Sequence, residues 1–107
     1  MVQVVYNRTY HRVTVNGHAG SAPYGEDLVC AAVSGLVYAL DANIRRLQSM
    51  GVVRDVVITA ESGKAEIACK CRRKHEATVT LIYDAICLGF SELEEEYPQY
   101  ICFEIRE

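Results

Sequence analysis

A turn-rich loop that leads directly into a long apolar helix constrains this chain more than any other feature. Residues 17–26 contain three glycines and a proline, and such residues continue neither a strand nor a helix. From Leu28 to Ser49, apolar side chains recur at the spacing of a helix, at Val29, Ala32, Val33, Leu36, Leu40, Ile44 and Leu47. The fold must therefore place this loop beside the first turn of a long amphipathic helix.

Two reactive side chains flank this junction, His18 in the loop and Cys30 near the start of the helix. Asp27 is a suitable N-cap, because its carboxylate can accept hydrogen bonds from the free amides of the first turn. Cys30 would then be the third helical residue, where those amides and the helix macrodipole favour a thiolate. In this interpretation His18 acts as a base or as an imidazolium partner of the thiolate, and the amides hold a developing oxyanion. In the alternative, Cys30 is a small core residue and His18 an ordinary loop histidine.

Alternating apolar residues on both sides of this helix predict strands. The predicted strands cover about 2–6, 11–15, 52–60, 65–71 and 99–105, and a second apolar stripe predicts a helix over 76–97. The order β-β-α-β-β-α-β predicts an α+β fold, with a five-stranded, mostly antiparallel or mixed sheet packed with two helices. At 107 residues the chain is long enough for one core and not for two, so we expect a single domain over 1–107.

Composition narrows the class of protein. Half of the residues are hydrophobic and the net charge is −3, which argues against a nucleic-acid-binding surface. The first residues lack the features of a signal peptide, and no uninterrupted apolar run is long enough to span a membrane. The five cysteines do not show the spacing of a small disulfide domain, so reduced thiols are expected. We therefore expect a cytoplasmic protein.

Several polar groups outside the loop have two interpretations each. Cys69 and Cys71 resemble a metal or redox pair, but such pairs usually have two or more intervening residues. We interpret them as core residues and predict neither a metal nor a cofactor. His11, in the second predicted strand, is interpreted as a structural or surface residue. The run Arg72–His75 is a solvated turn or a contact for an acidic partner or ribosomal RNA. The glutamates of 92–96 form a solubilising face or attract a basic peptide.

The junction contains the residues Gly17-His18-Ala19-Gly20 and Gly25-Glu26-Asp27-Leu28-Val29-Cys30-Ala31-Ala32-Val33-Ser34. This pattern closely resembles the signature of the ribosomal-processing cysteine protease (Prp) family. In that family a loop histidine and a cysteine twelve residues later are the catalytic pair, and His18 and Cys30 stand at that spacing. Asp27 and Ser34 match the acidic residue and the serine of the signature. The resemblance implies the same fold, a homodimer, and a substrate: the N-terminal extension of a large-subunit ribosomal protein of the bacterial L27 type.

We therefore predict a cysteine endopeptidase with a dyad, in which Cys30 attacks a peptide carbonyl and His18 transfers the proton. Gly17, Asp27 and Ser34 are predicted to support the site or to bind substrate. The expected partner is the N-terminal peptide of the ribosomal protein precursor, with no membrane and no direct nucleic acid. One alternative is a non-enzymatic, ribosome-associated module that binds RNA or protein. Another is a redox or metal protein centred on the cysteine pair at 69 and 71.

Overall fold

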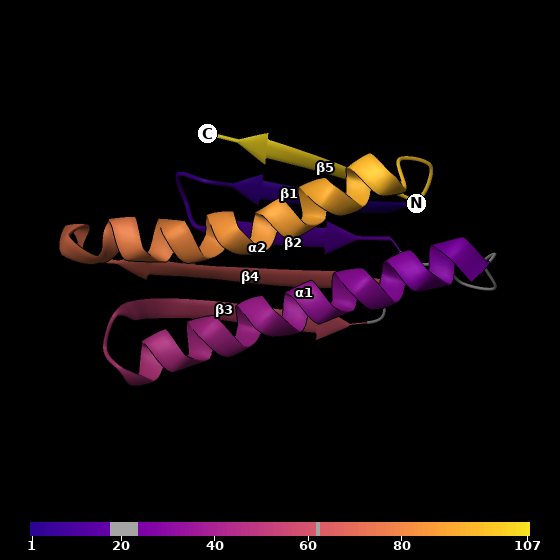
Figure 1. The fold of residues 1–107 in the computed structure, drawn as a ribbon. Coiled ribbons are helices and arrows are strands. Elements are labelled where there is room, and N and C mark those ends of the chain that lie inside the picture. The colour runs from indigo at the N-terminus through magenta and orange to yellow at the C-terminus, as the bar shows by residue number, and fades with distance from the viewer. Residues whose placement is uncertain (18–23, 62) are drawn as a thin grey trace.

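The computed structural model describes residues 1–17, 24–61 and 63–107, and its elements follow the predicted order (Figure 1). The strands are β1 (Val2–Asn7), β2 (Arg12–Asn16), β3 (Val53–Glu61), β4 (Lys64–Cys71) and β5 (Ile101–Arg106). The helices are α1 (Tyr24–Ser49) and α2 (Glu76–Glu96), and a short 3₁₀ helix, η1 (Arg73–His75), leads into α2. The predicted α+β class is confirmed.

The five strands form one mixed sheet in the order β3-β4-β2-β1-β5. Neighbouring strands are antiparallel except β1 and β5, which are parallel. Both helices lie over the same face of the sheet, α1 toward β3 and α2 toward β5 (Figure 1). No described element covers the opposite face. Because side chains alternate along a strand, each strand has one buried side and one open side.

The core lies between the sheet and the two helices. β1 and β2 bury Val2, Val4, Tyr6, Val13 and Val15; α1 buries Val29, Val33, Leu40, Ile44 and Leu47; and α2 buries Val79, Tyr83, Cys87 and Phe90. Within the described chain, the segment Leu28–Ser49 is also long and apolar enough to cross a membrane by length and composition. A core helix passes the same test, and the inner side of α1 is buried against the sheet, so we assign α1 to the core.

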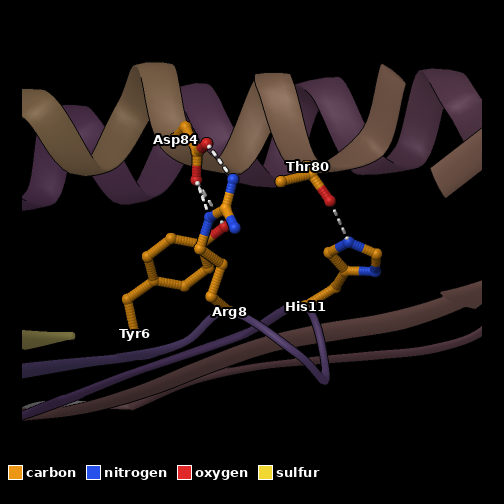
Figure 2. Close-up of polar contacts among 5 residues, drawn as sticks. All are labelled: Tyr6, Arg8, His11, Thr80 and Asp84. Atoms are coloured by element: carbon orange, nitrogen blue, oxygen red, sulfur yellow. Dashed lines mark hydrogen bonds and ion pairs between the residues drawn. The ribbon is translucent and has the colours of Figure 1, made fainter. Parts of the chain in front are cut away.

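Polar contacts attach α2 to the ends of β1 and β2 (Figure 2). Asp84 of α2 accepts a hydrogen bond of 2.8 Å from the Tyr6 hydroxyl, and bonds of 3.2 and 3.1 Å from Nε and Nη2 of Arg8. The hydrogen bonds from Arg8 hold the pKa of the Asp84 carboxyl below its usual value. His11 Nε2 lies 2.7 Å from Thr80 Oγ1, and burial lowers the pKa of this imidazole.

His11 lies in the turn before β2 and not on the strand where it was predicted. Its backbone has a φ of 48°, and its side chain is only 5% exposed beneath α2. His11 fits the alternating pattern that continues with Val13 because its side chain points into the core, although its backbone is that of a turn and not of a strand. The interpretation of His11 as a structural residue agrees with this position.

Candidate active site

A cavity of about 180 Å³ lies between the first half of α1 and the adjoining ends of the strands. From α1 its walls contain Cys30, Val33, Ser34, Val37 and Tyr38. From the sheet they contain Val2, Val15, Ala60 and Ala65, with Gly17, Gly63 and the charged residues Glu61 and Lys64. The cavity is therefore mostly apolar, with one thiol, from Cys30, and two hydroxyls, from Ser34 and Tyr38, on its helical wall.

Cys30 and Ser34 share this wall because residues four apart lie one above the other on a helix. Cys30 is a free thiol and is partly buried, whereas Val29 and Val33 beside it are fully packed in the core. A nucleophilic thiol needs access to its substrate. The position of Cys30 provides that access at the edge of the core, with the Ser34 hydroxyl one turn away.

The buried cysteines lie in a different environment. Cys69 and Cys87 are core residues, and burial raises the pKa of Cys87 to about 12 and that of Cys69 above its usual value. The Cys69 sulfur lies 3.7 Å from the oxygen of the Tyr83 hydroxyl. Cys71 lies at the end of β4 and is half-buried. The interpretation of Cys69 and Cys71 as packing residues therefore fits Cys69 fully and Cys71 in part.

α1 begins at Tyr24, four residues before the predicted start at Leu28. Asp27 therefore lies inside the first turn, and its prediction as the N-cap was wrong. Cys30 is the seventh helical residue and not the third, so its amide is beyond the four that a helix leaves free. The missed signal is the proline at position 23, because proline is favoured at the beginning of a helix.

The backbone at Gly17 fixes the point where the loop leaves the sheet. Its φ is 102°, and a Cβ at this position would overlap the carbonyl oxygen of Met1. The Gly17 amide donates a hydrogen bond of 2.9 Å to the carbonyl oxygen of Gly63, which ties the end of β2 to the β3–β4 turn. Only glycine fits here. His18 lies outside the described residues, so its pairing with Cys30 stays a prediction.

Three residues of the cavity with polar side chains were not predicted as site residues. Tyr38 is 67% exposed and follows Ser34 by one further turn of α1, so helical spacing from Cys30 would have found it. Glu61 and Lys64 are register partners across the β3–β4 hairpin. No local signal places this hairpin beside α1, because their approach depends on strand pairing far apart in the sequence.

This arrangement defines a class of protein. A partly buried thiol on a helix, an apolar cavity beside it and a histidine that directly follows the cavity residue Gly17 in sequence are the parts of a cysteine-dependent hydrolase. Among the described residues, no group of three His, Cys, Asp or Glu side chains is placed to bind a metal ion.

Comparison with known proteins narrows this class to one family. The family model for the cysteine protease Prp matches residues 1–102. The chain therefore belongs to the Prp family of ribosomal-processing cysteine proteases. The predicted family resemblance and the prediction of a cysteine protease are confirmed.

Individual relatives agree with this assignment. The ribosomal processing cysteine protease Prp of Mycoplasma pneumoniae is 30% identical over 102 residues, which cover 90% of this chain and 88% of the relative. The crystal structure of SMU.848 from Streptococcus mutans has a TM-score of 0.66 at 26% identity and covers 98% of this chain and 91% of its own. The fold is also that of Prp from Staphylococcus aureus, solved with a substrate peptide, with a TM-score of 0.74 at 21% identity and coverage of 99% and 100%.

Proposed function

We propose that this protease removes the N-terminal extension of a large-subunit ribosomal protein of the bacterial L27 type, with Cys30 and His18 as its catalytic dyad. One observation carries the proposal: Cys30 and Ser34 line the same cavity as Gly17, the residue from which the loop containing His18 departs. The name of the Mycoplasma relative supports a ribosomal substrate, and the peptide bound to the Staphylococcus aureus protein supports a peptide ligand.

In the proposed reaction, the Cys30 sulfur attacks the scissile carbonyl carbon and His18 removes the thiol proton. His18 returns this proton to the leaving amine as the peptide bond breaks, which leaves an acyl thioester on Cys30. Water then hydrolyses the thioester and restores the thiol. Side chains on a helix lean toward its N-terminus, so the thiol reaches back toward the free amides of residues 24–26, where we place the oxyanion.

The remaining predicted site residues support this chemistry in different ways. We propose that the Ser34 hydroxyl donates a hydrogen bond to the substrate backbone or to the thiolate. Asp27 places negative charge in the first turn of α1, where the macrodipole favours it. Gly17 fixes the start of the loop. We also propose that residues 1–107 act as a single cysteine-protease domain, in the cytoplasm and as a homodimer, as the family resemblance implies.

Cleavage of a leader peptide, read by mass spectrometry, tests the dyad. Cys30→Ala should lower kcat/KM by at least about 10³-fold, because it removes the nucleophile. His18→Ala should lower kcat by about 10²-fold or more and change KM little. Cys102→Ala is the matched control, because Cys102 is an exposed free thiol on β5. The dyad is wrong if Cys30→Ala and His18→Ala cleave like the parent.

A further inference from the structure

A second hollow lies on the sheet at the opposite end of β4 from the cavity that contains Cys30. Its volume is about 480 Å³, and its lining includes Tyr10, Arg12, Arg54 and Lys70, together with the acidic residues Asp55 and Glu76. We call this site the basic hollow. We propose that the basic hollow binds single-stranded RNA, with phosphates on Arg12, Arg54 and Lys70 and a base stacked on Tyr10.

The strand register brings the three cations of the basic hollow together. Arg54 of β3 and Lys70 of β4 are direct partners, and Arg12 of β2 is the partner of Ala68, two residues before Lys70. All three therefore project from the open face of the sheet. Like charges directly opposite each other on neighbouring strands destabilise a sheet. A bound anion would remove this repulsion between Arg54 and Lys70.

The carboxylates nearby compensate these cations only in part. Arg12 is paired with Glu66, and Arg54 lies 3.8 Å from Asp55 with both side chains exposed. Such surface pairs contribute little energy and exchange easily with another anion. Lys70 has no ion pair within the described residues. At least one cation of the basic hollow is therefore free for a phosphate.

The basic surface continues beyond the hollow along η1. Arg72, Arg73 and Lys74 follow directly after β4, are exposed, and form no ion pair with any described side chain. The glutamates of 92–96 lie at the other end of α2 (Figure 1). Positive and negative charge are thus separated along the molecule. The negative net charge of the chain argued against direct binding of nucleic acid. The electrostatic potential that a ligand meets, however, depends on how the charges are distributed over the surface.

Tyr10 favours RNA over other anionic partners. Tyr10 is 70% exposed in the β1–β2 turn, and its amide donates a hydrogen bond of 3.3 Å to Asn7 Oδ1, which holds the turn. An exposed aromatic ring beside arginine and lysine is the usual platform for an unpaired base. An acidic peptide would use the cations but would not need the ring.

Fluorescence anisotropy with a labelled 12-nucleotide single-stranded RNA tests this proposal on the full chain. Neutralising three or four phosphates predicts that log K falls with log salt concentration with a slope of about −2 to −3. Lys70→Glu should weaken binding at least about tenfold, because it removes one phosphate contact and adds repulsion. Lys64→Glu is the matched control, since it makes the same charge change on the same strand at the other end. It should change the affinity less than about twofold.

A second variant separates RNA from a general anion. Tyr10→Ala should weaken RNA binding about fivefold or more, which corresponds to the loss of one stacked base, and should leave the binding of inorganic polyphosphate unchanged. Absence of RNA binding at 50 mM salt would overturn the proposal. Equal losses for Lys64→Glu and Lys70→Glu would do the same, as would equally effective competition by polyglutamate. No readout requires peptide cleavage, so this result is independent of the proposed protease substrate.

Discussion

Replacing Asp84 with alanine removes the carboxylate that joins α2 to β1 (Figure 2). Tyr6 is 1% exposed, and a buried hydroxyl left without its partner costs about 1–3 kcal/mol. The ion pair with Arg8 has side chains 42% and 34% exposed, so solvent screening limits its contribution to about 1 kcal/mol or less. The free energy of unfolding should therefore fall by about 2–3 kcal/mol, and Tm by about 10 °C or more.

Urea unfolding followed by circular dichroism measures this loss. Tyr6→Phe removes the hydroxyl together with its need for a partner, so it should cost less than Asp84→Ala. The double variant should cost less than the sum of the two single variants, because both remove the same hydrogen bond. An Asp84→Ala loss below about 0.5 kcal/mol, or additive losses in the double variant, would show that these contacts do not hold α2 in place.

Two further predictions concern acid stability and the backbone at the cavity. Burial lowers the pKa of His11 below its usual value of 6.5, so the unfolded chain binds the proton more readily and the protein loses stability as the pH falls below 6.5. In urea unfolding, His11→Gln should therefore lose less stability than the parent protein between pH 7.5 and pH 5.5. An equal loss in both proteins would contradict this prediction. Gly17→Ala should destabilise the protein by about 2 kcal/mol or more through its positive φ and the backbone overlap. Gly35→Ala, with open space around its Cβ in α1, should be neutral or stabilising by about 1 kcal/mol, and similar losses for both variants would refute the argument about Gly17.

Sequence patterns predicted the elements because each strand and helix has one buried side. In α2, however, the buried side of the helix differs in part from the apolar stripe that the sequence shows. Ile82 and Ile86 belong to the apolar stripe from which the helix over 76–97 is predicted, but they are only partly buried, whereas Tyr83 and Cys87 are fully buried. Tyr83 can be buried because its hydroxyl donates to the Ile67 carbonyl oxygen at 3.3 Å, and this partner on β4 is not visible from the helix sequence.

The sequence could not predict contacts that depend on strand order. β1 pairs in parallel with β5, which lies near the other end of the chain. β2 pairs with β1 and β4, and not with β3, the strand that follows it in sequence. Both choices are set by packing under the two helices. The basic hollow follows from the same pairing, because Arg12, Arg54 and Lys70 come from three strands and form no motif in the sequence.

The β2–β4 pairing and the start of α1 bear on how Cys30 could be activated. This pairing places Asn16 beside Lys64, so Gly17 at the end of β2 lies next to the β3–β4 turn and on the wall of the cavity that contains Cys30. Because α1 begins at Tyr24, the free amides lie a turn before Cys30, and the helix end alone cannot account for a reactive thiol. We therefore predict that His18 supplies most of the activation. His18→Ala should therefore slow alkylation of Cys30 as well as cleavage, and fast alkylation in that variant would return the main role to the helix end.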